Sequence, residues 1–439
     1  MSITATKIAL ITKRSKEKPQ EKMNNLAYLL NAEYLRECYQ ELKKGKAPGI
    51  DGRTLESYTK EEIEQEIENT ITAMKAKKYN PKPVRQTFIE KLNGKLRPLG
   101  IPTVIDKIVQ QGIKKIVEAI FEPHFLDCSY GFRPNRDCHQ ALKAVYKMVM
   151  TKPINWIVDI DIKGFFDNVN HHWMIECLEQ RIADPNFKSI IIKFLKAGVI
   201  IEGKYQKTDK GTPQGGILSP LLANIYLHYV LDLWFQRKLT KEIKGYTEMV
   251  RYADDFIIGA QTKLEAEEIL EKVKLRLKEF GLEVSNEKTR IIEFGRYAKT
   301  NSRDTGNNKP DTFNFLGFTH YCSKSKKGNF LMKVKTDKKR MSDKLREMNK
   351  WLKKIRNLIT IKEIWKALSI RLKGHYNYYG VSSNSRSIQT FYYQTTRLTR
   401  KWMNRRSQKK SFSITEFYEY LKQYPIVKPA LAYNMYDIW

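Results

Sequence analysis

Apolar residues recur along most of this chain at the spacing of amphipathic helices. In residues 56–78, Ile63, Ile67, Ile71 and Met74 lie three or four positions apart and therefore share one helical face. Residues 1–22 are polar and basic, and they are expected to form a loose arm. Comparable apolar patterns predict helices over residues 24–44, about 104–150, 171–197, from 220 to about 240, and 263–280.

Strands are expected where β-branched and aromatic residues form short runs between turn residues. Such runs occupy residues 155–162 and 250–258. Helices and strands are mixed without a regular βα repeat, which indicates an α+β fold. Further extended segments are predicted around a turn at Asn93-Gly94 (80–102), in a hairpin over 199–211, and near 282–294 and 313–321.

The charge of the chain changes the picture from fold to partner. Its 439 residues carry a net charge of +32, which repels itself and favours a polyanionic partner. Nucleic acid is the expected partner, with an anionic membrane surface as the alternative. Residues 333–410 hold 23 Lys or Arg and four acidic residues, a net +19, with apolar and aromatic residues at helical intervals. This predicts a basic, helical C-terminal domain that binds nucleic-acid backbone.

Several other function classes are disfavoured. No unbroken apolar run reaches the roughly 18 residues that a membrane span needs. The N-terminal stretch lacks the apolar core of a secretory signal, although its basic character leaves organelle targeting as an alternative. The five cysteines form no CxxC pair, which argues against a zinc finger, and their odd number indicates reduced thiols. A bacterial-type cytoplasmic location is expected.

Two apolar runs carry aspartates, and they are the strongest chemical signal. Asp254 and Asp255 interrupt "VRYADDFII", where carboxylates cost free energy unless they are compensated. In "VDIDIKGFFD", the strand period places Asp159 and Asp161 on one face. If the two strands are neighbours, the carboxylates repel each other unless Mg²⁺ neutralises them. The alternative is a hairpin turn in which aspartate side chains bond the backbone.

Converging carboxylates on a basic chain predict a nucleotidyl transferase, because two Mg²⁺ ions about 4 Å apart are a common device for phosphoryl transfer. Ordered motifs make the prediction more specific, and over roughly residues 45–425 they resemble the motif blocks of group II intron reverse transcriptases. These motifs are "GKLRPLGIPTVIDKIVQQGI" (94–113), "SYGFRPNRDCHQAL" (129–142), "DIDIKGFFDNVNH" (159–171), "PQGGILSP" (213–220), "YADD" (252–255), "GLEVSNEKTRI" (281–291), "FNFLGF" (313–318), "RLKGHYNYYGV" (371–381) and "WMNRRSQKKSF" (402–412).

The resemblance implies an α+β right-hand polymerase with fingers, a ferredoxin-like palm and a basic, helical thumb. No His/Asn-rich nuclease segment follows residue 412, so the chain is similar to compact members without an HNH endonuclease, and target-DNA cleavage is not expected. The expected domains are an N-terminal extension (1–57), fingers (58–150), a palm with the catalytic site (151–322) and a thumb/maturase domain (323–439).

The family also implies roles for residues of the palm. Asp161, Asp254 and Asp255 would bind the metals, and the Ile162 carbonyl would help. Asp161 is preferred to Asp159 only because of its place in the family motif. Phe166 matches the aromatic residue that excludes a sugar 2′-OH and so selects dNTPs over rNTPs, with Phe165 as its core neighbour; the alternative is that Phe166 is itself a core residue.

Further roles concern the nucleotide and the nucleic acid. Lys91 and Arg97 would grip the triphosphate, although Lys91 could equally be a surface lysine. Gln214 and Gly215 would touch the nascent base pair. Lys288 would protonate the leaving pyrophosphate, with simple charge balance as the alternative. The resemblance places a primer grip at Phe315, Leu316 and Gly317, and the basic thumb adds the nucleic-acid contacts Arg397, Arg400, Lys401, Arg405 and Arg406.

The resemblance therefore implies an RNA-directed DNA polymerase that copies intron RNA into cDNA and assists splicing and retrohoming. Its expected partners are an RNA template, a DNA primer or target, and dNTPs, with two Mg²⁺ ions as cofactors and Mn²⁺ as a substitute. Two alternatives stay open. One is an RNA-binding maturase in which polymerisation is secondary, and the other is a domesticated enzyme of DNA repair or phage defence.

Overall fold

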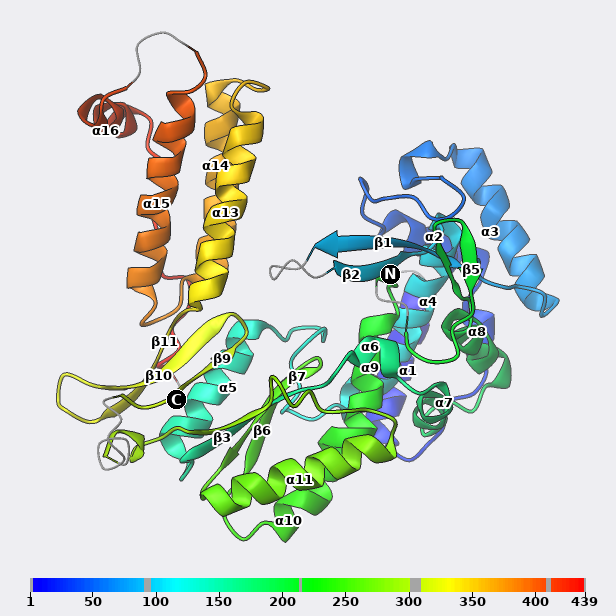
Figure 1. Ribbon diagram of the computed structural model, residues 1–439. Coiled ribbons are helices and arrows are strands. Elements are labelled where there is room, and N and C mark those ends of the chain that lie inside the picture. The colour runs from blue at the N-terminus through cyan, green and yellow to red at the C-terminus, as the bar shows by residue number, and fades with distance from the viewer. Residues whose placement is uncertain (1–2, 91–95, 213–214, 301–308, 408–411, 438–439) are drawn as a thin grey trace.

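The computed structural model describes residues 3–90, 96–212, 215–300, 309–407 and 412–437, and it is a mixed α+β structure (Figure 1). A broad body contains two four-stranded sheets and most of the helices, and a column of helices rises from one side of it. Within the described ranges, no helix has the length and apolar character that crossing a bilayer would require.

The central sheet is antiparallel throughout and has the strand order β6-β7-β3-β8. Both faces are covered, so the strands are largely apolar. Val158, Ile160 and Ile258 belong to the same core as α11, whereas Ile157 and Ile257 belong to the core of α5. The elements are β3 (Trp156–Asp161), β6 (Glu248–Tyr252), β7 (Asp255–Ala260), β8 (Arg290–Glu293), α5 (Cys138–Thr151) and α11 (Lys263–Glu279).

A second sheet, in the order β2-β1-β4-β5, combines two separate parts of the chain. β1 (Val84–Glu90) and β2 (Leu96–Ile101) are an antiparallel pair, and β4 (Val199–Ile201) joins β1 in parallel. The hairpin predicted over 199–211 is formed by β4 and β5 (Lys204–Gln206). Although the sequence placed these residues with the palm, they pair with the strands assigned to the fingers.

Helices surround these sheets, and α4 is buried along most of its length. The expected helix from 220 to about 240 begins as α9 and continues as two π-helical segments, His228–Asp232 and Phe235–Leu239, before α10 (Thr240–Glu242). The remaining helices of the body are α1 (Ile3–Glu17), α2 (Ala32–Gln40), α3 (Lys60–Lys75), α4 (Val104–Phe121), α6 (Phe165–Asn168), α7 (His171–Glu179), α8 (Pro185–Leu195) and α9 (Ser219–Leu227).

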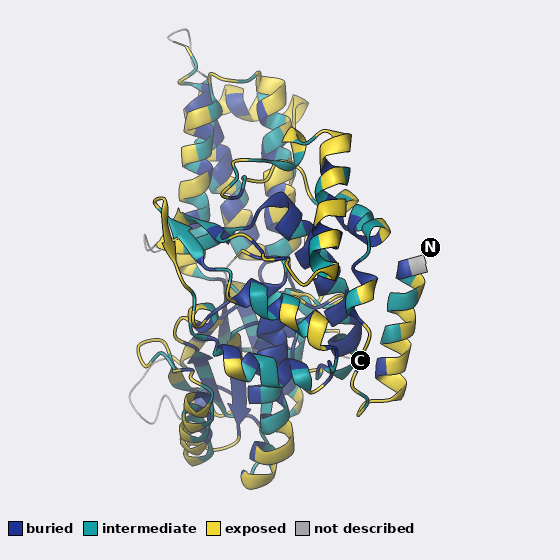
Figure 2. Cartoon of the chain, turned by 90° about the vertical axis from the view of Figure 1, so that its right-hand side faces the viewer, coloured by how far each residue is buried: buried dark blue, intermediate teal, exposed yellow. Residues whose placement is uncertain are grey.

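The expectation of a loose N-terminal arm is wrong, because α1 packs on the body. Ser15 is buried, and its hydroxyl donates to the Ile120 carbonyl at 2.7 Å. Ile8 and Ile11 pack against the main core. Figure 2 shows α1 at the edge of the molecule with exposed residues along its outer side. A few apolar side chains among many polar ones are therefore enough to dock this helix.

The C-terminal part begins with a three-stranded antiparallel sheet, β9 (Thr312–Phe315), β10 (Phe318–Lys324) and β11 (Phe330–Thr336). The column in Figure 1 follows, and it consists of α13 (Lys338–Ile355), α14 (Ile361–Tyr379), α15 (Ser385–Met403) and, at its far end, α16 (Ile414–Gln423). The chain then returns to the base of the column, where Tyr433 bridges Val381. The helices predicted for this basic segment are present, and β11 precedes them.

Candidate active site

A tight hairpin presents the paired aspartates. Tyr252 at the end of β6 pairs with Asp255 at the start of β7, so Ala253 and Asp254 form a two-residue turn. Ala253 has φ of 58°, the left-handed conformation that the first turn residue of a type II′ hairpin adopts. The strands are buried up to this turn, and the aspartates emerge at the sheet edge, as the sequence predicted.

The second acid-bearing strand lies directly beside the first. β3 pairs with β7 in a register that sets Asp161 opposite Asp255 and Asp159 opposite Ile257. Side chains alternate between the faces of a strand, so Asp159 and Asp161 point to the same side. The carboxylates of both motifs therefore converge at one edge of the central sheet.

The convergence alters the acidity of these groups. Burial, together with the neighbouring Asp159, Asp254 and Asp161, raises the pKa of Asp255 to about 7. Burial also raises the pKa of Asp159 to about 6, with Arg290 opposing it. For Asp254, burial and Asp161 raise the pKa, while Arg97 and Arg251 lower it. Like charges that lie close together favour the protonated form, so the site would gain from a bound cation.

Basic side chains compensate part of this charge. The Lys288 ammonium donates to Asp161 Oδ2 at 2.8 Å, and Arg290 lies 3.4 Å from Asp159 Oδ2. Both basic side chains are more than half exposed, where ion pairs contribute little. In this structure Lys288 therefore balances the charge of Asp161, and its role as a proton donor stays a prediction.

The donor set is the one that Mg²⁺ prefers, namely carboxylate oxygens. Across the described ranges, however, no three His, Cys, Asp or Glu side chains are already gathered around one point as a metal site. The Asp161 carbonyl accepts from Ser285 N–H on the β8 side, so the next carbonyl, that of Ile162, points towards the β7 side. Its predicted role as an oxygen ligand is compatible with that direction.

Two adjacent phenylalanines differ as the sequence predicted. Phe165 is 2% exposed and belongs to the core, whereas Phe166 is only partly buried. Phe166 lines a pocket of about 240 Å³ together with Pro98 and Gly100 of β2. The Thr212 N–H donates to the Phe166 carbonyl at 2.7 Å, which ties the loop before α9 to this position.

The remaining nucleotide contacts are only partly described. Lys91 and Gln214 lie outside the described residues. Arg97 is exposed on β2, and its charge reaches Asp254. Gly215 has φ of 109°, and a Cβ there would lie 2.8 Å from the Gly100 carbonyl oxygen. Gly215 is therefore required for a close approach to β2, a reason that the sequence alone did not supply.

Comparison with known proteins decides the family. Residues 81–320 match the family model described as "Reverse transcriptase (RNA-dependent DNA polymerase)". The chain is 33% identical, over 90% of its length, to Group II intron-encoded protein LtrA of Lactococcus lactis subsp. cremoris, of which 76% is covered. The chain belongs to the group II intron reverse transcriptases. It is therefore an RNA-directed DNA polymerase.

Two further relatives are intron proteins of eukaryotes. The reverse transcriptase is 30% identical, over 87% of its length, to an uncharacterized 91 kDa protein in the cob intron of Schizosaccharomyces pombe, of which 54% is covered. It is 29% identical, over 29% of its length, to nuclear intron maturase 4 of Arabidopsis thaliana, of which 16% is covered.

The predicted primer grip of the reverse transcriptase is a two-residue turn between β9 and β10. Leu316 and Gly317 have φ of 51° and 77°, and the Tyr378 hydroxyl donates to the Leu316 carbonyl at 2.9 Å. A bulky residue with positive φ is a strained feature that often marks a functional site. Phe315 is a correction, because it is 1% exposed in the core and cannot touch nucleic acid directly.

A pocket of about 630 Å³ connects this turn with the carboxylates. It is lined by Asp255, Leu316 and Gly317 and by basic residues of the helical column, including Arg340 and Arg371. Arg340 lowers the pKa of Asp255, so its charge reaches the site. Arg340 was not identified from the sequence. The signal that could have found it is its position as a cation three residues after Asp337, which caps the N-terminus of α13.

The predicted thumb cations fall into two groups. Arg397 and Lys401 are exposed on α15, Arg405 is exposed in the turn just after it, and the three line a groove of about 690 Å³ with Tyr393 and Tyr418. Arg400 also lines this groove but donates to the Phe412 carbonyl, and Arg406 donates to the Ile359 carbonyl. Arg400 and Arg406 therefore have structural partners, which leaves the three exposed cations as the stronger candidates for phosphate contact.

Proposed function

We propose that Asp161, Asp254 and Asp255 are the catalytic carboxylates, and that they hold two Mg²⁺ ions with help from the Ile162 carbonyl. The observation that carries this is the register that sets Asp161 opposite Asp255, next to the turn with Asp254. When bound, such ions polarise the reacting phosphate and activate the attacking hydroxyl. Mn²⁺, which also prefers oxygen ligands, would substitute.

The surrounding elements fit a right-hand polymerase. The antiparallel strand order β6-β7-β3-β8 supports the assignment of this sheet as a ferredoxin-like palm. In this proposal β1 and β2 are the fingers, with the charge of Arg97 on β2 reaching Asp254, and the helical column seen in Figure 1 is the thumb. The domain limits predicted from the sequence stay predictions, with residues 199–206 contributing to the fingers sheet.

Each side chain near the carboxylates then has a task. Arg97 binds the triphosphate as a fixed cation, Phe166 blocks the space of a 2′-OH, and Lys288 leaves Asp161 to face the pyrophosphate. The Leu316-Gly317 turn supports the primer, because it lines the same pocket as Asp255. Lys91 and Gln214 complete the nucleotide site as predicted from the sequence.

The proposed template is a structured group II intron RNA. The enzyme copies this RNA into cDNA during retrohoming, and a DNA primer supplies the 3′-hydroxyl. The same protein assists splicing of that RNA, for which the exposed thumb cations Arg397, Lys401 and Arg405 are the proposed contacts. A maturase among the relatives supports this second activity. A cytoplasmic location stays a prediction.

Primer extension on a structured RNA template tests the proposal. Asp254→Asn and Asp161→Asn should each lower the extension rate by at least about 10³-fold, because each removes a charge that stabilises the transition state. RNA binding should persist. Asp209→Asn, a change at an exposed ion pair, is the control and should extend normally. Full-length cDNA from Asp254→Asn would contradict the assignment.

A further inference from the structure

A fully buried arginine lies beneath the catalytic turn. Arg251 is the bulkiest of the fully buried side chains in the described part of the chain, and its side chain is 0% exposed, as is that of Asp232. Arg251 Nε donates to Asp232 Oδ1 at 2.7 Å, and Nη2 donates to Asp232 Oδ2 at 2.5 Å. A buried guanidinium is strongly unfavourable unless it is fully paired, and even a paired one is weak evidence for a contribution to stability.

The other end of the guanidinium holds the turn itself. Arg251 Nη1 donates to the Ala253 carbonyl at 2.9 Å and to Asn224 Oδ1 at 3.0 Å. The Ala253 carbonyl belongs to the peptide group that leads into Asp254. Because Ala253 has a left-handed backbone, which alanine rarely adopts, that peptide needs an external partner to keep its orientation. Arg251 is this partner.

A neighbouring loop presses on the same turn. The Arg251 N–H donates to the Cys128 carbonyl at 2.7 Å, and the Tyr130 N–H donates back to the Arg251 carbonyl at 2.9 Å. Asn224 Nδ2 donates to the Gly131 carbonyl at 2.7 Å. A Cβ on Gly131 would lie 2.5 Å from the Ala253 nitrogen, so the loop backbone is in direct contact with the turn.

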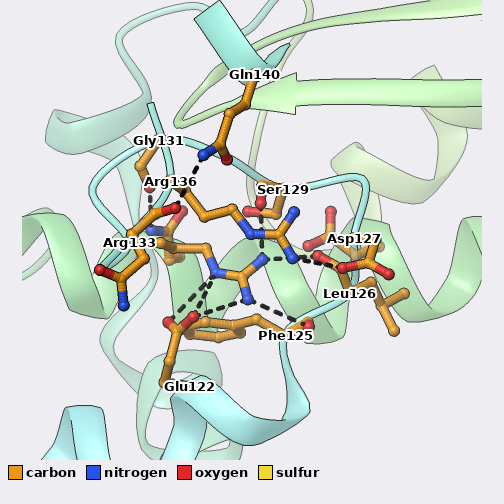
Figure 3. Close-up of polar contacts among 12 residues, drawn as sticks. Glu122, Phe125, Leu126, Asp127, Ser129, Gly131, Arg133, Arg136 and Gln140 are labelled. Carbon is orange, nitrogen blue, oxygen red and sulfur yellow. Dashed lines mark hydrogen bonds and ion pairs between the residues drawn. The ribbon is translucent and has the colours of Figure 1, made fainter. Parts of the chain in front are cut away.

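This loop is in turn held from inside by a second buried arginine, as Figure 3 shows. The Arg133 side chain is 4% exposed and forms an ion pair with Glu122 at 2.8 Å. Its Nη1 donates to the carbonyls of Leu126 and Ser129 at 2.8 and 2.7 Å. The loop that contacts the Asp254 turn is therefore held by Arg133 on one side and by Arg251 and Asn224 on the other.

We propose that Arg251 is a positioning residue for catalysis: with Asp232 and Asn224 it fixes the orientation of Asp254, and through it the affinity of the carboxylates for divalent cations. The inference rests on the proposed role of Asp254. The guanidinium charge is balanced by Asp232 at contact distance. The effect on the site is therefore mainly geometric, which distinguishes Arg251 from an open cation such as Arg97.

Two variants separate geometry from charge. Arg251→Lys keeps the charge but cannot reach Asp232, Asn224 and Ala253 together, because an ammonium lacks the planar fork. The double variant Arg251→Met with Asp232→Leu removes the ion pair and fills its space with apolar side chains. The matched control is Arg181→Met, which removes another buried arginine that donates to the Ser15 and Pro19 carbonyls near α1.

Three measurements are made on each full-length variant: Mn²⁺ affinity without substrate, hydrogen exchange of residues 250–258, and primer extension. Both Arg251 variants should bind Mn²⁺ about 10-fold more weakly and lower kcat about 10- to 100-fold, as expected for a partner behind the ligands. Exchange at 250–258 should accelerate, and KM for dNTP should change far less than kcat. Arg181→Met should lower Tm and alter none of these.

Unchanged Mn²⁺ affinity and unchanged exchange in a folded Arg251→Lys protein would overturn the inference. If the Arg251 variants do not fold, Asn224→Ala removes one bond to the guanidinium and one to the loop, and a smaller change in the same three measurements is expected; no change would again overturn it. Asp254→Asn separates the two levels, because normal Mn²⁺ binding and extension by that variant would instead contradict the proposed catalytic site.

Discussion

Asp161 and Asp255 are direct partners across two antiparallel strands. Residues in such a pair have Cβ atoms about 4.5–5.5 Å apart, and like charges placed there destabilise a sheet. The Lys288 ammonium donates to Asp161, and Arg340 offsets only part of the rise in the pKa of Asp255. The pair therefore costs folding stability, and under the proposed assignment a divalent cation bound there would restore it.

Mg²⁺ is accordingly expected to raise the thermal midpoint of the free enzyme. At a concentration ten times the dissociation constant, binding to the folded state alone adds about 1.4 kcal/mol. Thermal unfolding at constant ionic strength measures this, and Asp161→Asn should abolish the shift while Asp209→Asn retains it. An equal shift in Asp161→Asn would show that Mg²⁺ binds elsewhere.

Phe166 and Phe165 provide a matched pair for sugar selection. Phe166→Ala should raise rNTP incorporation relative to dNTP by on the order of tenfold or more, because the side chain that crowds the 2′ position is removed. Phe165→Ala should instead cost about 3–5 kcal/mol of folding free energy, since Phe165 is 2% exposed in the core. Single-nucleotide incorporation and chemical denaturation measure the two effects. Unchanged sugar selectivity in Phe166→Ala would mean that Phe166 is only a packing residue.

Lys288, which pairs with Asp161 in the free enzyme, is predicted to donate a proton during turnover. Lys288→Met should lower kcat by about 10²-fold, which is typical for loss of a general acid. Its folding stability should change by less than about 1 kcal/mol, because the pair with Asp161 is exposed. Pre-steady-state kinetics measures the first effect. A normal rate would favour simple charge balance.

The two aspartate-bearing strands could be predicted from the sequence because their signals are local. Alternation along 155–162 and the aspartates at the centre of 250–258 required only the period of a strand and the cost of a buried carboxylate. The pairing of β3 with β7 joins segments far apart in the sequence. From the sequence, this pairing could only be assumed or taken from the family resemblance. The structure supplies this pairing.

Other features depend on contacts that no local pattern reveals. Arg251 lies in a run with strand character. Nothing nearby in the sequence shows that Asn224 of α9 and Asp232 of the first π-helical segment contact its side chain. The docking of α1 depends on a few apolar contacts, such as those of Ile8 and Ile11, and on long-range hydrogen bonds such as that from Ser15 to Ile120. The motif placed Phe315 at a nucleic-acid surface, whereas strand alternation turns its side chain into the core.

The thumb groove is expected to carry part of the salt dependence of RNA binding. Replacing Arg397, Lys401 and Arg405 by Gln removes three exposed cations that line one groove beside the C-terminal end of α15. If each neutralises one phosphate, the slope of log affinity against log salt should fall by about 2 in magnitude. The control is the same change at Lys263, Lys274 and Lys278 of α11. Equal slopes for wild type and the α15 variant would exclude this groove as an RNA surface.

The loss of folding stability at acid pH is expected to depend on a buried histidine in β10, His320. His320 is 0% exposed and stacks on Phe313 at 4.5 Å between ring centroids, and burial lowers its pKa to about 3. Because the unfolded state binds this proton near its ordinary value of 6.5, the unfolded state holds more protons between pH 6.5 and about 3. The free energy of unfolding therefore does not depend on His320 titration above pH 6.5. Below pH 6.5 it falls with decreasing pH, by up to about 1.4 kcal/mol per pH unit.

His320→Phe keeps an aromatic ring on Phe313 and should remove one proton from that slope. The free energy of unfolding, measured with denaturant at several pH values, should fall less steeply for this variant than for wild type. His172→Phe is the control, because His172 is exposed. If His320→Phe and wild type lose stability in parallel between pH 6.5 and 4, the ring of His320 takes up its proton in the folded protein, and the acid sensitivity arises from other buried groups such as His228, whose pKa burial also lowers to about 3.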